Sequence, residues 1–121
     1  VSPTGKACYL MGSVMGNAAP VSPIDLTLSD RPMLPPLISL PINTLPVTPF
    51  FYLPAVDGPQ IVNWPSPFPV LTPAPGALST SLSVFDGDNP NGAWSLYILD
   101  DSGNDAGYIA NGWFVDFFAA P

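Results

Sequence analysis

Two acidic bends carry the side chains of this chain that are best suited to bind an ion. The C-terminal one holds four carboxylate or amide side chains within six residues: Asp100, Asp101, Asn104 and Asp105. Asp86, Asp88 and Asn89 form a second such group. Calcium takes six to eight hard oxygen ligands on flexible loops, so the 100–105 bend is a candidate calcium site. The alternative is that these side chains bond their own backbone in Asx turns.

The tripeptide Asp101-Ser102-Gly103 follows an apolar stretch, as the catalytic loop of an aspartic protease does. In such an enzyme two loops bring together two carboxylates that share one proton. A lone tripeptide carries little information, and a proline-rich centre fits no protease half. We therefore interpret these residues as a bend.

The composition excludes several classes of function. The 121 residues contain no His, so imidazole bases and His ligands for zinc or haem are absent. Lys6 and Arg31 are the only Lys and Arg residues, and the sequence has nine Asp. The resulting net charge of −7 disfavours binding to nucleic acid. The sequence has no long apolar run free of Pro, so it predicts no membrane span. Cys8 has no partner for an internal disulfide and lies in an apolar stretch, which indicates a buried, inert thiol. We expect no catalytic residues.

The chain is organised as a single domain, 1–121, with three zones. Residues 1–30 contain short strand patterns, of which 24–29 alternates apolar and polar side chains. Residues 31–75 hold 13 of the 18 prolines and predict an extended, polyproline-like insertion packed over a sheet or against a neighbour. Residues 76–121 alternate short strand patterns with bends, the strands being expected at 78–84, 93–99 and 113–117.

This last zone predicts an all-β protein, an antiparallel β-sandwich with a jelly-roll-like arrangement. One face of each of its last two expected strands is apolar, and together these faces are predicted to form the core: Trp94, Leu96, Ile98, Trp113, Val115 and Phe117. A turn motif of bend-favouring residues precedes them: Asn89, Pro90, Asn91 and Gly92.

The run Phe85-Asp86-Gly87-Asp88-Asn89-Pro90-Asn91-Gly92-Ala93-Trp94-Ser95-Leu96-Tyr97, with Asp100-Asp101, Asp105-Ala106-Gly107 and Asn111-Gly112-Trp113, resembles the proprotein convertase P domain (Homo B domain). It is most similar to the P-domain-like modules of bacterial secreted and cell-surface proteins, and the resemblance covers residues 76–118. It implies a jelly-roll sandwich without catalytic residues, located outside the cell or at its surface.

The first residues predict a further feature. Pro3 and Gly5 occupy the second and fourth positions of a type I turn, and a strand should follow at 7–11. Only Val1 stands where the first half of a hairpin belongs, and the resembled family has further strands upstream. We therefore expect a domain incomplete at its N-terminus, whose missing strands come from a neighbouring chain or segment.

These observations favour a non-enzymatic extracellular structural module, a subunit or module of a cell-surface polymer or filament that self-assembles by strand complementation. One alternative is an accessory P domain that stabilises a secreted subtilisin-like serine protease. The other is a carbohydrate-binding or adhesion module, which would need exposed aromatic side chains.

Overall fold

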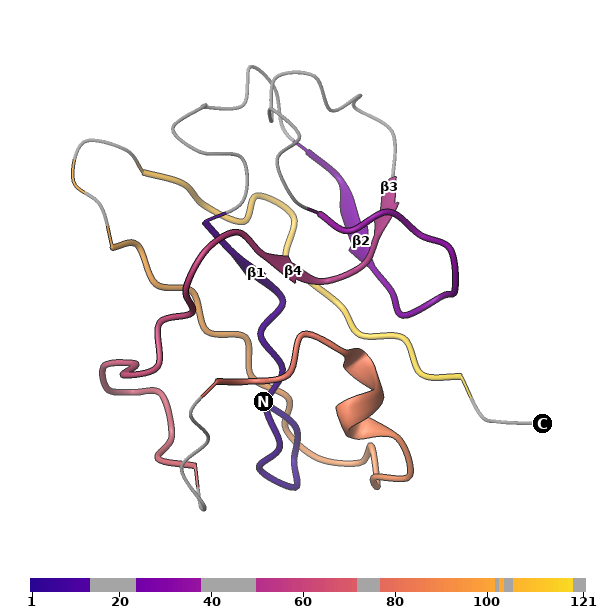
Figure 1. Ribbon diagram of the computed structural model, residues 1–121. Helices are drawn as coiled ribbons and strands as arrows, with labels where there is room; N and C mark the ends of the chain where they lie inside the picture. Colours follow the sequence, from indigo (N-terminus) through magenta and orange to yellow (C-terminus); the bar gives the residue numbers. More distant parts are fainter. Residues whose placement is uncertain (14–23, 38–49, 72–76, 102, 104–105, 119–121) are drawn as a thin grey trace.

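The computed structural model describes residues 1–13, 24–37, 50–71, 77–101, 103 and 106–118, and regular structure occupies few of these residues (Figure 1). It contains four short strands and one 3-10 helix in the described part: β1 (Met11–Gly12), β2 (Leu26–Leu28), β3 (Phe50–Tyr52), β4 (Ala55–Val56) and η2 (Leu82–Phe85). Most of the other described residues form turns and extended chain.

The four strands form two separate two-stranded sheets, and both pairs are parallel. In one sheet β2 pairs with β3, with Leu26 opposite Phe50. In the other, β1 pairs with β4, with Met11 opposite Ala55. Isolated parallel bridges join Cys8 to Ser79 and Pro36 to Leu53. The 24–29 pattern therefore did mark a strand, because β2 lies inside it.

The predicted antiparallel jelly-roll sandwich is wrong for this structure. The described residues contain no antiparallel ladder, and of the expected strands at 78–84, 93–99 and 113–117 none forms. Residues 93–99 and 113–117 are outside any ladder in the described chain. Alternation shows which side chains share a face, but strand formation needs a backbone partner, and the sequence does not name one.

The expected strand at 78–84 is replaced by the helix η2 for a local reason. Ser81 is the N-cap of η2, and its hydroxyl accepts a hydrogen bond from the Ser83 backbone N–H at 3.3 Å. Asp30 reinforces this cap, because one carboxylate oxygen accepts from Ser83 N–H at 2.6 Å and from the Ser81 hydroxyl at 2.9 Å. Serine side chains thus compete with a ladder for the backbone donors.

The proline-rich zone supplies β3, β4 and the best-buried side chain of the described chain. Leu37 is 1% exposed and packs with Tyr52 and Ala55, against which Leu26 and Leu28 also pack. Pro36 and Leu53 are bridged, with the Leu37 N–H donating to the Leu53 carbonyl at 3.1 Å. Prolines are tolerated here because every strand of a two-stranded sheet is an edge strand.

A row of four aromatic rings connects segments far apart in the sequence. Tyr9 meets Trp64 edge-on at 5.7 Å between centroids, Trp64 stacks on Phe68 at 5.2 Å, and Phe68 meets Tyr97 at 5.0 Å. Offset and edge-to-face pairs of this kind stabilise the fold beyond the apolar area that they bury.

No helix among the described residues is long and apolar enough to cross a membrane.

Candidate functional site

The N-terminal turn docks onto the acidic bend at 86–92. The Gly5 N–H donates to the Ser2 carbonyl at 3.0 Å, which confirms the turn predicted for Ser2 to Gly5. The Val1 amino group donates to the Ser95 carbonyl at 2.8 Å, and the Ser95 N–H donates to the Val1 carbonyl at 3.0 Å. This reciprocal pair holds the first residue against the extended chain that follows the bend.

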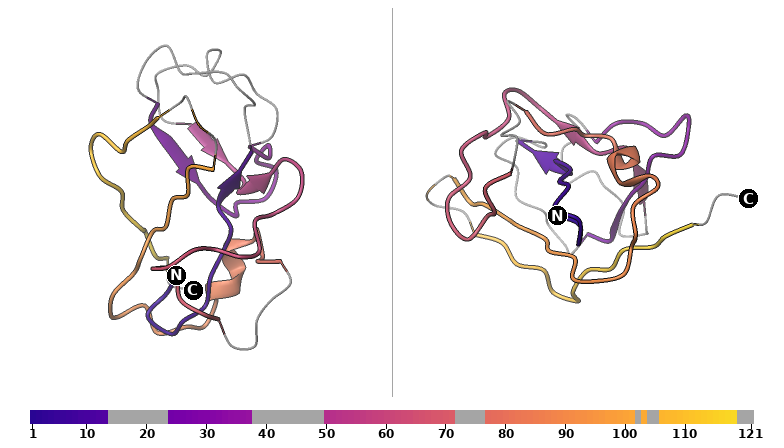
Figure 2. Two further views of the ribbon diagram at one scale, coloured as in Figure 1. Left: turned by 90° about the vertical axis from the view of Figure 1, so that its left-hand side faces the viewer. Right: turned by 90° about the horizontal axis from the view of Figure 1, so that it is seen from below.

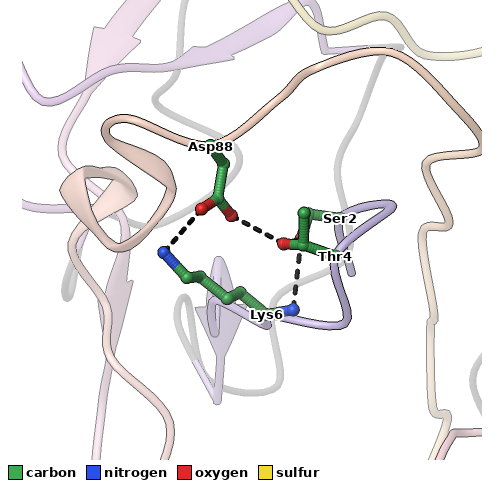
Figure 3. A network of polar contacts seen from close by, with 4 residues as sticks. All are labelled: Ser2, Thr4, Lys6 and Asp88. Carbon is green, nitrogen blue, oxygen red and sulfur yellow. Dashed lines mark hydrogen bonds and ion pairs between the residues drawn. The ribbon is translucent and has the colours of Figure 1, made fainter.

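Asp88 is the centre of the polar network at this contact (Figure 3). Its Oδ1 lies 2.7 Å from Lys6 Nζ, and its Oδ2 accepts a hydrogen bond from the Thr4 hydroxyl at 2.7 Å. Thr4 and Ser2 share a further hydroxyl contact at 2.9 Å, and Ser2 Oγ accepts from the Lys6 N–H at 3.1 Å. One of the two basic side chains is thereby committed to structure.

The Lys6 and Thr4 contacts, in that order, lower the pKa of Asp88 below its ordinary value of 3.8. A carboxyl whose pKa is lower in the folded than in the unfolded state stabilises the fold above the unfolded pKa, and loses that contribution as the pH falls through the folded one. We expect Asp88→Asn to melt below wild type at neutral pH. The difference should shrink as the pH falls below 3.8 and vanish once the pH is below the lowered folded pKa. Thermal melts across pH measure this, and a constant difference would contradict it.

The turn motif at 89–92 forms the Asx turn that was the alternative to ion binding. Asn89 Oδ1 accepts from the Asn91 N–H at 3.0 Å and from its side-chain amide at 2.8 Å. The indole N–H of Trp94 donates to the Pro90 carbonyl at 3.0 Å. Gly92 has φ +132°, and a Cβ there would lie 2.7 Å from Pro3 Cβ, so this position requires glycine.

Of the candidate calcium ligands, Asp100 and Asp101 lie in the described chain, and both are exposed. Asn104 and Asp105 lie outside the described residues, as does Ser102 of the protease-like tripeptide. Within the part of the chain that is described, no group of three or more acidic or Cys side chains could hold a metal ion. Calcium binding at the 100–105 bend stays a prediction.

The six side chains predicted to form a sandwich core differ in how far they are buried. Trp94 and Leu96 are half-buried, and Trp94 contacts Phe85 and Phe117 at 5.1 and 5.0 Å between ring centroids. Ile98 is 71% exposed, and Trp113, Val115 and Phe117 are 41–49% exposed. The expected closed interior between two strands is therefore corrected: Trp94 and Phe117 form a ring contact, but four of the six side chains are exposed, because these segments join no sheet of the described chain.

The C-terminal segment, residues 106–118, holds seven of the thirteen large hydrophobic side chains that are exposed in the described chain. Phe114 and Phe118 are 74% and 83% exposed, whereas the alternate residues Trp113, Val115 and Phe117 are less so. This period of two is the signature of extended chain. The segment makes no backbone hydrogen bond to other described residues, and in Figure 2 it runs along the periphery of the molecule.

A hollow of about 360 Å³ is lined by Asp30, Leu53, Pro54, Thr80, Ser81 and Ser83. The Asp30 carboxylate in this lining already accepts the hydrogen bonds from Ser81 and Ser83 that cap η2. Nearby, the Cys8 thiol donates to the Ser81 carbonyl at 3.5 Å. The sequence did not indicate this grouping, because it joins residues from three separate parts of the chain.

Burial, and next the negative charge of Asp30, raise the pKa of the Cys8 thiol from 9.0 to about 12. Reactivity follows the thiolate, so we expect native Cys8 to react with an alkylating reagent roughly a thousandfold more slowly than an unfolded thiol at the same pH. Urea should restore the rate. Equal labelling of native and unfolded protein would show that Cys8 is accessible and reactive, against the sequence prediction of an inert thiol.

No family model, no curated protein and no solved structure matches this chain.

Proposed function

We propose that this protein is a non-enzymatic structural module that joins copies of itself through the C-terminal segment, as a subunit of an extracellular or cell-surface polymer. One observation carries the proposal: a thirteen-residue stretch, 106–118, which bends at residues 110–111, combines large exposed apolar side chains with backbone groups that have no partner among the described residues. Large exposed apolar patches mark interaction sites, and unpaired extended backbone is a template for strand addition.

The same chain offers surfaces that could receive such a strand. Each described sheet has only two strands, so its outer edges are open in the described chain. Phe51 on β3 and Met11 on β1 are 46% and 47% exposed, which places apolar side chains beside these edges. A strand donated by one copy to the edge of the next is a heterologous contact, and such contacts generate open polymers unless the rotation closes a ring.

Charge favours a second copy over a basic partner as the occupant. The C-terminal segment carries a single charge, Asp116, and Lys6, one of two bases in the chain, is paired with Asp88. A basic partner would find little to attract it on the segment itself. Two copies, each with net charge −7, repel one another at long range, and salt screens this repulsion. Self-association should therefore strengthen with ionic strength, whereas binding to a basic partner would weaken.

The proposal that the protein lies outside the cell or at its surface rests on the sequence. Residues 76–118 resemble the P-domain-like modules of bacterial secreted and surface proteins, although the jelly-roll fold that the resemblance implied is not found. The absence of His and the lack of a catalytic arrangement in the sequence support a role without chemistry. These features support the structural role and do not favour the protease-accessory alternative.

Sedimentation velocity at a series of protein and salt concentrations tests the proposal. We expect species larger than the monomer at micromolar concentration, growing with salt, and an interface above about 1,000 Å². A monomer at every concentration and salt level would overturn the proposal. Association that weakens with salt would point to a charge-driven contact instead of the apolar segment.

A second candidate, carbohydrate binding, is favoured by the exposed aromatic rings of the segment. Tyr108 is 90% exposed, and Phe114 and Phe118 are also well exposed, so the exposed aromatic side chains that such a function requires are present. The 360 Å³ hollow has none of them in its lining. Retention on immobilised polysaccharide by the wild type, lost in Tyr108→Ala without change in self-association, would favour this candidate over the polymer.

A further inference from the structure

The chain contains two Asn–Gly dipeptides in very different surroundings, Asn91-Gly92 in the acidic bend and Asn111-Gly112 in the C-terminal segment. We propose that Asn111 is a site of spontaneous modification, at which the chain converts asparagine to aspartate and isoaspartate, and that the folded structure protects Asn91 from the same reaction. This proposal does not depend on the proposed function.

The chemistry uses only the chain and water. The Gly112 backbone nitrogen loses its proton to solvent base and attacks Asn111 Cγ, forming a C–N bond, and the side-chain amide nitrogen leaves as ammonia. The product is a five-membered succinimide. Water then adds to either carbonyl and breaks one C–N bond, giving aspartate or, when the original peptide carbonyl is attacked, isoaspartate. Glycine favours the reaction because it has no Cβ to obstruct the attacking nitrogen.

The surroundings of Asn111 leave this path open. Asn111 is exposed, and its side chain makes no hydrogen bond within the described chain. Gly112 has φ +79°, and a Cβ built there would find no heavy atom within 4 Å. Neither the attacked carbon nor the attacking nitrogen is therefore held in an unreactive geometry by neighbouring groups.

The surroundings of Asn91 close the same path. Asn89 Oδ1 holds both the backbone N–H and the side-chain amide of Asn91, at 3.0 and 2.8 Å. Gly92 is packed against Pro3, whose Cβ lies 2.7 Å from the position of an added Cβ. Rotation of the Asn91 side chain toward the Gly92 nitrogen would break the amide contact and disturb the packing of the N-terminal turn.

The consequence for assembly rests on the proposed function. Isoaspartate places one extra methylene in the backbone two residues before Trp113, and adds a negative charge to a segment that otherwise carries only Asp116. A strand depends on an unbroken period of two for its register. Modification at Asn111 should therefore weaken docking of the segment and act as a slow, irreversible limit on polymer growth.

The test is peptide mapping by mass spectrometry after incubation of the full chain in mildly alkaline buffer made with heavy-oxygen water. Asn111 should gain one solvent oxygen and react on the order of tenfold or more faster than Asn91, at which two hydrogen bonds must break first. The Asn89→Ala substitution should raise the rate of modification at Asn91 and leave the rate at Asn111 unchanged. Asn111→Gln should block modification there. In urea the two wild-type rates should converge.

Equal rates at the two sites in the folded chain, or a faster reaction at Asn91, would overturn the proposal. An Asn89→Ala chain whose Asn91 stays slow would also overturn the claim that the fold protects it. Self-association is measured separately on aged and Asn111→Gln protein. If Asn111 reacts as expected but the aged chain associates as the Asn111→Gln chain does, the modification stands and its effect on docking is refuted. If no chain associates, the modification stands and the proposed function fails.

Discussion

Replacement of Phe114 by aspartate is expected to weaken self-association about a hundredfold or more. Aromatic anchors at the centre of an interface are worth about 2 kcal/mol or more on truncation, and an unpaired charge buried in the contact adds to the loss. Phe114 is 74% exposed and has no ring partner among the described residues, so the substitution should leave the isolated chain folded. Sedimentation velocity and a thermal melt of the same sample measure the two effects separately.

Val70→Asp is the matched control, because Val70 is 92% exposed and lies outside the C-terminal segment. The control adds the same charge and also removes an exposed apolar side chain, although a smaller one. It should associate as the wild type does. If both variants lose association equally, net charge and not the segment governs it. If Phe114→Asp associates like the wild type, the segment is not the contact.

Truncation of Trp94 to alanine is expected to cost about 3 kcal/mol of folding free energy, at the low end for tryptophan because the side chain is half-buried. The variant loses the ring contacts with Phe85 and Phe117 and the hydrogen bond to the Pro90 carbonyl. For a domain of ordinary stability this is a large fraction of the total. Denaturant unfolding followed by circular dichroism gives the value.

Tyr108→Ala serves as the control for that truncation, since Tyr108 is 90% exposed and a surface substitution of this kind changes stability by about 0.5 kcal/mol or less. A Trp94→Ala protein that unfolds at the same denaturant concentration as Tyr108→Ala would show that Trp94 anchors nothing.

Local features were predictable from the sequence where the interaction is itself local. The turn at Ser2 to Gly5 follows from Pro and Gly at fixed turn positions, and the Asx turn at Asn89 follows from a short polar side chain two residues before its partner. β2 follows from alternation over 24–29. Each of these depends on residues within a few positions of one another.

Pairing between distant segments was not predictable. Alternation at 113–117 correctly places Trp113, Val115 and Phe117 in one row of similar exposure, but it does not say what covers that row. A sandwich was inferred because apolar rows are usually covered within the domain. Both sheets instead use parallel partners from the proline-rich zone, where proline argued against strands.

The Asp88 network was beyond sequence reasoning for the same reason. Thr4 and Asp88 are 84 residues apart, and nothing in the pattern distinguishes Asp88 from the other eight acids as the partner of Lys6. An acid's partner is decided by how the two turns are brought together in space.

Amide hydrogen exchange of residues 106–118 at low and high protein concentration tests the central claim most directly, because it reports the backbone hydrogen bonds that strand addition would create. The C-terminal segment should exchange freely in dilute protein and become protected as concentration rises, while β2 and β3 change little or gain protection at their edges. Exchange of the segment that is equally fast at every concentration, in a sample shown to associate, would contradict the account.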